Sequence, residues 1–334
     1  MGNSYPHHEG GASLPENIMK KYIVTHAGVS HRDDFLSCAL ALTLDSGLNR
    51  IERRDPTEAE LDDPNVWCID IGLRHEPHLH NFDHHQLSKD AAPACSLTYI
   101  LQHMGILEAS RRYNWVTMSE KLDSKGPFVV AEGLANEVAE TISLDDDDYY
   151  LPILKVWFAD RFTNNMNPIE RVVLDMFYSS SVVSFESPLF DMMLLIGRDT
   201  TKHLSEGKTK LDLIAKHAII EQVGDFQVMS LMAHELDEVD IWEEVDITVR
   251  ESKADIAVIV SPDSRGDGWQ LNRLNDDPRV DFTLIKDRDE IVFAHVSGFV
   301  ATTTAIFTSD KINELILAAT VKSTTPRINS GACN

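Results

Sequence analysis

Residues 22–42 read YIVTHAGVSHRDDFLSCALAL, and this stretch decides the fold. A β-prone run at residues 22–24 ends in a polar loop at residues 25–31. A helical stretch follows, and its first turn holds Asp33 and Asp34, whose carboxylates suit the positive end of a helix dipole. The order strand, polar loop, helix is typical of the opening of an α/β domain.

A second strand is predicted at residues 66–72, which read VWCIDIG and place Asp70 near the strand's end. Predicted strands alternate with helical stretches along this part of the chain, which favours a parallel sheet. Ligands of such sheets bind at the carboxyl ends of the strands. We therefore expect Asp70 to lie at the ligand-binding edge.

The chain has 334 residues, and 30 Lys and Arg stand against 54 Asp and Glu, giving a formal net charge of -24. This acidity argues against a protein that coats long nucleic acid by neutralising many phosphates. A small anionic substrate remains compatible with it if a bound metal reverses the local charge.

The composition also predicts a location. No stretch has the roughly 18 uncharged apolar residues of a membrane span, and residues 1–20 lack the apolar core of a secretory signal. The 4 cysteines fit neither a disulfide framework nor a zinc site of the C-x-x-C type. We expect a cytoplasmic protein with reduced cysteines and no membrane association.

Four parts are predicted along the chain: a flexible tail at residues 1–20, a catalytic domain at 21–200, a linker and helix at 201–222, and a C-terminal domain at 223–334. Residues 197–210 are polar and are interpreted as linker, and a helix is expected at 211–222. Val- and Ile-rich runs at 255–260 and 290–295 predict strands of the C-terminal domain. Helices are also expected at 95–104, 151–162 and, for the most part, 169–196. The aspartate run at 145–148 is interpreted as the solvated start of a helix.

Seven of the 14 histidines lie between residues 26 and 85, at positions 26, 31, 75, 78, 80, 84 and 85. His26 and His31 lie near Asp33 and Asp34 and precede Asp70 in the sequence. His84 and His85 lie next to Asp83 and follow Asp70. Carboxylates and imidazoles together suit Mn²⁺, Mg²⁺ or Zn²⁺, and such ligands at neighbouring strand ends could hold two ions. His75, His78 and His80 are expected in an exposed loop.

Several segments resemble the DHH phosphoesterase superfamily: residues 25–34, THAGVSHRDD; residues 70–72, DIG; and residues 81–86, NFDHHQ. They are most similar to the branch formerly called metal-dependent protein hydrolases, whose studied eukaryotic member is an RNA exonuclease. Residues 268–271, GWQL, and 293–299, FAHVSGF, resemble that branch's C-terminal signatures. The resemblance implies an α/β protein with a parallel-sheet metal-binding domain and a smaller α/β domain that grips substrate.

The resemblance also implies two divalent ions, Mn²⁺ in our prediction, with Mg²⁺ or Zn²⁺ as alternatives. The implied ligands are His26, His31 and Asp70 for one ion, and Asp33, Asp70 and His84 for the other, with Asp70 as the bridge. A further aspartate is expected downstream after a helix, and we predict Asp160. His85 would point at the substrate phosphate or leaving oxygen, and Asp83 would orient a ligand histidine. Asp34 could either support the ligands or cap the helix.

Four further residues are predicted to contact substrate: Arg32, Arg265, His295 and Gly298. Arg32 could contact phosphate or lie on a helix surface. Arg265 belongs to a turn whose amides and guanidinium could hold an anion. The chain continues Gly298-Phe299 with Val300 and Ala301 where the branch tends to have a glycine-rich pair, so backbone approach to phosphate is less assured.

The function predicted from these observations is metal-dependent hydrolysis of phosphodiester bonds in a phosphate-containing small molecule, RNA or a short oligonucleotide. One alternative is a phosphoanhydride or nucleotide hydrolase that uses the same site. A second is a catalytically silent metal-binding regulatory module, and a third is a hydrolase of some other bond.

Overall fold

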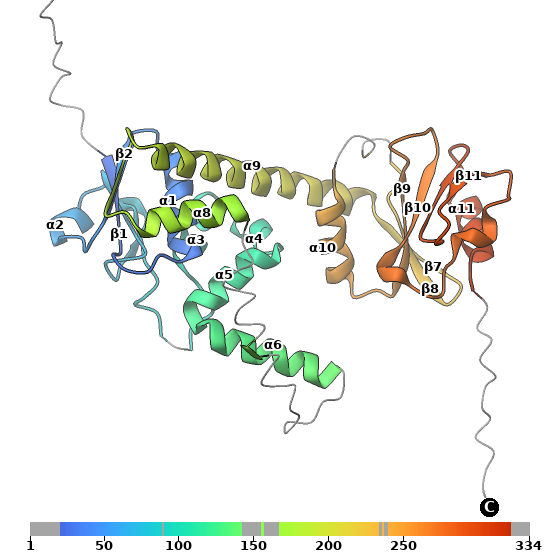
Figure 1. Ribbon diagram of the computed structural model, residues 1–334, viewed down its shortest axis with the longest axis horizontal. Coiled ribbons are helices and arrows are strands. Elements are labelled where there is room, and N and C mark those ends of the chain that lie inside the picture. The colour runs from blue at the N-terminus through green and yellow to red at the C-terminus, as the bar shows by residue number, and fades with distance from the viewer. Residues whose placement is uncertain are drawn as a thin grey trace, which may run out of the picture. The chain divides into compact units, whose positions relative to one another are not determined.

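The computed structural model describes residues 21–88, 90–141, 155–156, 167–233, 236 and 240–321. The chain divides into two compact units, residues 1–205 and 206–334 (Figure 1). Each is a mixed α/β unit with one six-stranded sheet. The aspartate run at 145–148, Asp160, and all of the helix predicted at 151–162 except residues 155–156 lie outside the described residues.

The sheet of the first unit has the strand order β4-β5-β3-β1-β2-β6. Its strands are β1 (Lys21–Thr25), β2 (Leu48–Arg53), β3 (Val66–Ile69), β4 (His75–Glu76), β5 (Asn81–Phe82) and β6 (Val182–Ser184). The four central strands β5, β3, β1 and β2 are parallel, whereas β4 and β6 pair antiparallel at the edges. The predicted parallel sheet is therefore the centre of a mixed one.

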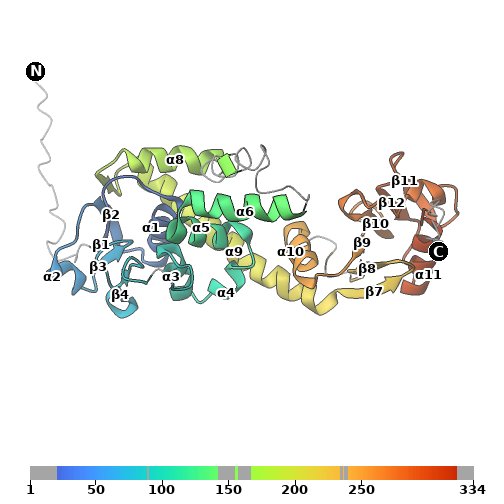
Figure 2. The ribbon, with the colours of Figure 1, turned by 90° about the horizontal axis from the view of Figure 1, so that it is seen from below.

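Helices lie on both faces of this sheet. The helices described in the first unit are α1 (Arg32–Leu44), α2 (Glu58–Leu61), α3 (Ser96–His103), α4 (Leu107–Ser110), α5 (Asn114–Lys125), α6 (Pro127–Thr141), α8 (Pro168–Tyr178) and α9 (Pro188–His217), whose last turns belong to the second unit. Figures 1 and 2 place α2 on one side of the sheet and α1 on the other. Leu61 of α2 packs on Val24 and Cys68, while α1 contacts α3, α5 and α8. Burial of α1 fixes the direction in which its first turn points.

The segment predicted as a linker is helical, and this prediction was wrong. Residues 197–210 lie inside α9, which ends at His217, and the C-terminal part of the helix predicted at 211–222 is the strand β7 (Ile219–Val223). The segment contains no proline, so polarity alone did not break the helix. Gly197 marks a close helix crossing, because a Cβ there would overlap the carbonyl oxygen of Ala39 in α1.

The sheet of the second unit has the order β11-β12-β10-β9-β8-β7. After β7 come β8 (Phe226–Ser230), α10 (Trp242–Ser252), β9 (Ile256–Pro262), β10 (Trp269–Arg273), β11 (Ile291–Ala294), β12 (Val300–Thr303) and α11 (Ser309–Ala318), with short 3-10 turns η3 (Leu274–Asp276) and η4 (Phe282–Ile285). Only β8 and β9 pair in parallel among these described strands. Leu315 of α11 and Val245 of α10 belong to two separate apolar clusters of this unit.

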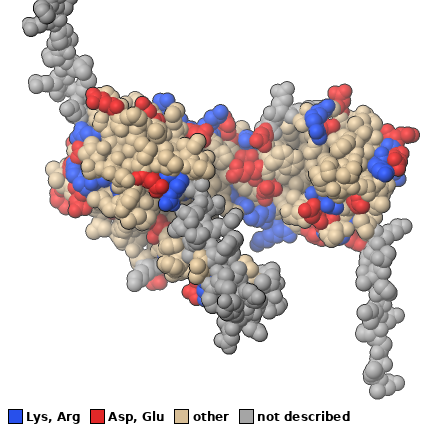
Figure 3. Space-filling model, viewed as in Figure 1, with Lys and Arg blue, Asp and Glu red and all other residues tan. Residues whose placement is uncertain are grey.

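Two general features accompany the fold. Within the described residues, no helix is both long and apolar enough to cross a membrane. On the face shown in Figure 3, acidic and basic side chains are interspersed among uncharged ones. The cysteines that the structure describes, Cys38, Cys68 and Cys95, are buried free thiols.

Candidate metal centre

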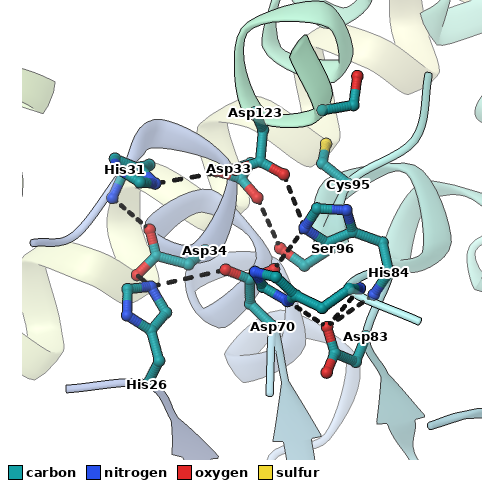
Figure 4. Close-up of polar contacts among 12 residues, drawn as sticks. His26, His31, Asp33, Asp34, Asp70, Asp83, His84, Cys95, Ser96 and Asp123 are labelled. Carbon is teal, nitrogen blue, oxygen red and sulfur yellow. Dashed lines mark hydrogen bonds and ion pairs between the residues drawn. The ribbon is translucent and has the colours of Figure 1, made fainter. Parts of the chain in front are cut away.

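The candidate site lies where the parallel strands of the first unit end. β1 leads into the loop that carries His26 and His31, β3 into Asp70, and β5 into Asp83, His84 and His85. Because β5, β3 and β1 are parallel neighbours, these loops meet at one edge of the sheet (Figure 4). Asp70 has a φ of 59°, a left-handed conformation that aspartate tolerates better than most residues.

Four ligand atoms converge at the centre of this edge. One atom each from Asp33, Asp70, His84 and Asp123 lies within 4.8 Å of the others. His84 Nε2 is 3.2 Å from Asp70 Oδ1 and 2.7 Å from Asp123 Oδ2. These three atoms are buried, and none makes a well-directed hydrogen bond despite their proximity. Buried polar atoms without a hydrogen-bond partner are costly, so this cluster fits a divalent cation as the missing partner.

The charges of the cluster affect its own pKa values. Burial raises the pKa of Asp33 well above its usual range, and the neighbouring carboxylates of Asp70 and Asp123 raise it further. Burial also raises the pKa of Asp70. Burial alone would lower the pKa of His84, but Asp123 and Asp70 raise it to about 10. An excess of negative charge therefore surrounds a single imidazole, which is the electrostatic setting that a cation stabilises.

His26 and His31 lie beside this cluster. His26 Nε2 is 3.5 Å from Asp70 Oδ2 and 3.3 Å from Asp34 Oδ2. His31 Nδ1 is 3.8 Å from Asp123 Oδ1, and the two imidazole rings are 6.3 Å apart between centroids. The structure thus brings both histidines to the same edge, at a looser spacing than that of the four central ligands.

Asp34 combines the two roles that its sequence position left open. Its carboxylate accepts a hydrogen bond of 2.6 Å from the backbone N–H of His31, which satisfies a free donor at the start of α1. The other carboxylate oxygen accepts the Ser30 hydroxyl at 2.8 Å and faces His26. The Asp34 contact raises the pKa of His26 to about 9 against the opposing effect of burial. Asp34 thereby ties the helix start to a predicted ligand.

Asp83 holds His85 rather than the ring of His84. Its Oδ1 accepts from His85 Nδ1 at 2.7 Å and from the backbone N–H of His84 at 2.7 Å, and its Oδ2 accepts from the backbone N–H of Leu73 at 2.6 Å. Burial would raise the pKa of Asp83, but these hydrogen bonds outweigh it and lower the pKa. The bond to Asp83 in turn raises the pKa of His85, whose ring is half-exposed.

Buried polar residues hold the ligand-bearing segments in place. The Ser96 hydroxyl at the start of α3 lies 3.1 Å from Asp33 Oδ2. Arg53, at the end of β2, donates to the carbonyl of Gly28 at 2.8 Å and to the carbonyls of Phe177 and Tyr178 at 3.2 and 2.8 Å. Arg53 therefore joins the loop that carries His26 to the C-terminal end of α8.

Of the four predicted substrate residues, one belongs to the first unit and three belong to the second. Arg32 makes a two-pronged ion pair with Glu170, at 2.6 and 3.0 Å, and stacks over the Trp115 ring, so the helix-surface interpretation describes it better than phosphate contact. Arg265, His295 and Gly298 belong to the second unit. A Cβ at Gly298, whose φ is +67°, would overlap the Asp281 carboxylate, which gives this glycine a structural role. Their contact with substrate stays a prediction.

Sequence reasoning missed Asp123. It lies in α5, within residues 111–144, for which no ligand was predicted. Ser119, Glu120 and Asp123 follow the three- and four-residue spacing of one helix face, but only the structure shows that Ser119 and Glu120 are buried. A buried face with two carboxylates on an otherwise polar helix indicates a polar site.

The centre opens into a pocket of about 670 Å³. His26, His31, Asp70, His85 and Asp123 are among its lining residues. This volume is within the range of small-molecule sites. The first unit thus combines a mixed α/β fold with an acidic, histidine-rich centre at the carboxyl ends of its parallel strands, beside a pocket of ligand size.

One segment of the chain matches a known family model. Residues 22–98 match the family model MYG1_exonuc, described as an uncharacterised protein family (UPF0160). The match confirms, for this segment, the resemblance predicted from His26 to His85. Among solved structures, the chain is similar to the pGpG-specific phosphodiesterase PggH from Vibrio cholerae, with 13% identity over 89% of this chain and 97% of that chain. Their TM-score of 0.29 does not establish a common overall fold. No curated protein matches the chain.

Proposed function

We propose that this chain is a divalent-metal-dependent phosphodiesterase that hydrolyses short RNA or other short oligonucleotides. The observation that carries the proposal is the convergence of Asp33, Asp70, His84 and Asp123, with three orphaned ligand atoms, beside a pocket. The family match at residues 22–98 supports it. The net charge of -24 favours short substrates over long polyanions.

The proposed ligands form two sets that share Asp70. Asp33, His84 and Asp123 complete the set at the centre, and His26 and His31 complete the set beside it. The mixture of carboxylates and imidazoles suits Mn²⁺, with Mg²⁺ or Zn²⁺ as alternatives. When bound, the ions supply the Lewis acidity that activates water and the positive charge that neutralises phosphoryl oxygens.

The chain's own residues supply orientation and a proton. Asp83 fixes His85 through its Nδ1, which leaves Nε2 as the group that can donate a proton. Because the Asp83 hydrogen bond raises the pKa of His85, the ring keeps its proton to a higher pH than a free histidine. His85 also lines the pocket, so we assign it the protonation of the leaving oxygen.

The test is hydrolysis of a panel made of a short RNA, the matching DNA, a dinucleotide and pyrophosphate, each with Mn²⁺, Mg²⁺ or chelator. We expect cleavage of the short RNA with Mn²⁺, and a loss of at least about 100-fold in Asp70→Asn, because the shared ligand is removed. Asp199→Asn, an exposed aspartate of α9, is the matched control and should keep full activity.

Other outcomes identify the alternatives. Cleavage of pyrophosphate alone would indicate a phosphoanhydride hydrolase. Tight binding of metal without cleavage of any substrate would indicate the regulatory module. Full activity in Asp70→Asn would contradict the proposed ligand sets.

A further inference from the structure

Part of the pocket lining, called its second end below, is formed by residues outside the proposed ligand sets. Asp55 and Pro56 follow β2, whose last residue Arg53 pairs with Thr25 of β1, so they emerge beside the His26 loop. Glu58 and Leu61 of α2 also line the pocket. These residues belong to neither ligand set.

Two apolar side chains of this pocket are unusually exposed. Val29 is 61% exposed and Leu73 is 65% exposed, and both lie on loops that also carry proposed ligands. Ile71 and Pro56 add further apolar surface to the lining. Exposed apolar side chains inside a pocket favour a ligand with a flat or apolar part, and a nucleobase has that character.

The charge of the lining is negative. Among the described residues that line the pocket there is no Lys or Arg, whereas Asp55 and Glu58 add carboxylates at the second end. Glu58 is paired with Arg74 at 2.6 Å. Within the described part of the chain the Asp55 carboxylate makes no ion pair, and its neighbour Arg54 is engaged by Glu52 and Glu60.

We infer that the second end of the pocket binds the terminal nucleoside of the substrate, and that it selects a terminus that carries a hydroxyl instead of a phosphate. This rests on the proposed function. A carboxylate accepts hydrogen bonds from hydroxyl and amino groups, and it repels a phosphate at the same place. The apolar side chains of Val29 and Leu73 would contact the base.

Binding of nucleosides tests this independently of catalysis. Adenosine, adenosine 5′-monophosphate and adenosine 3′-monophosphate are titrated against the full chain in chelator, and their affinities are measured by ligand-observed NMR. We expect adenosine to bind more tightly than the monophosphate that carries its phosphate at the bound terminus. Asp55→Asn should narrow the ratio of the two affinities by about fivefold, the effect of one like-charge pair at about 4 Å in water.

Two further variants separate this site from others. Leu73→Asn should weaken binding of all three ligands, and asparagine tolerates the left-handed backbone found at this position. Asp199→Asn should change none of the affinities. Absence of adenosine binding in the wild type, or an unchanged affinity ratio in Asp55→Asn, would overturn the inference.

Catalysis identifies which terminus is bound. With Mn²⁺, kcat/KM is compared for the dinucleotide ApA without terminal phosphate, for its 5′-phosphorylated form and for its 3′-phosphorylated form. A phosphate at the bound terminus should lower kcat/KM at least about fivefold, and Asp55→Asn should restore most of the loss. Equal kcat/KM for all three would contradict the inference. Nucleoside binding as expected, with no cleavage of ApA, would refute the proposed function alone.

Discussion

Replacing Arg53 by methionine should destabilise the first unit. The Arg53 side chain is 6% exposed, and its guanidinium donates to the carbonyls of Gly28, Phe177 and Tyr178. Methionine keeps most of the aliphatic stem, but it removes the guanidinium that lies over the Phe177 ring and leaves the three carbonyl groups without this donor. A hydrogen bond to a charged group contributes about 1.5 to 3 kcal/mol.

The expected loss in the free energy of unfolding is about 3 kcal/mol. Three lost hydrogen bonds to a charged donor would cost more than this, but the Phe177 carbonyl keeps its hydrogen bond from the backbone N–H of Ser180, and removal of a buried charge returns part of its desolvation penalty. Arg53→Lys keeps the charge but lacks the planar fork, so we expect about half of the loss.

Amide hydrogen exchange followed by mass spectrometry measures this within the first unit. A loss of 3 kcal/mol corresponds to roughly 100-fold faster exchange in peptides from β1 and β2. Arg198→Met, at an exposed position of α9, is the control and should change exchange less than about threefold. An effect of Arg53→Met below about 1 kcal/mol would refute the assignment of Arg53 as the residue that joins the His26 loop to α8.

Three further predictions concern other positions. Gly298→Ala should destabilise the second unit by about 2 kcal/mol, seen as faster exchange in β12, because the Cβ meets Asp281 at a positive φ; unchanged exchange would contradict this. Burial and then the charge of His80 lower the pKa of His103, so its neutral ring is favoured in the folded state. The stability that this ring contributes as a neutral group is complete above the unfolded-state pKa of about 6.5 and is lost as the pH falls. The free energy of unfolding of His103→Phe should therefore rise relative to that of the wild type between pH 7.5 and 5. A difference between the two free energies that stays constant with pH in urea unfolding would contradict this prediction. Ser96→Ala removes a hydrogen-bond donor to Asp33 and should weaken Mn²⁺ binding about tenfold with an unchanged circular dichroism spectrum, whereas equal affinity would contradict that role.

The part of the fold that positions the site could be predicted from the sequence. Local patterns sufficed there: a β-prone run before a polar loop gives β1, the apolar stretch after Asp33 gives α1, and VWCI gives β3 with Asp70 at its end. The short strands β4 and β5 carry no such pattern, since two residues are too few for a periodicity. The antiparallel edge strand β4 was missed for that reason, whereas the other edge strand, β6, lies inside the stretch 169–196 that was predicted to be mostly helical.

The candidate ligands near the strand ends could be predicted because they are close in sequence to recognisable elements. Asp123 could not, because it reaches the site through the packing of α5 against α1 and α3, which local sequence does not show. The assumed linker failed differently, since polar composition was taken as a sign of a loop although 197–210 holds no proline. Asp160, predicted as the downstream ligand, lies outside the described residues.

The number of bound Mn²⁺ ions tests the central claim most directly. Equilibrium dialysis with elemental analysis should find two ions per chain in the wild type and in Asp199→Asn. Asp70→Asn and Asp123→Asn should each bind no more than one ion tightly, because each change removes a ligand from the central cluster. Two tightly bound ions in Asp70→Asn, or no more than one weakly bound ion in the wild type, would contradict the proposed two-ion centre.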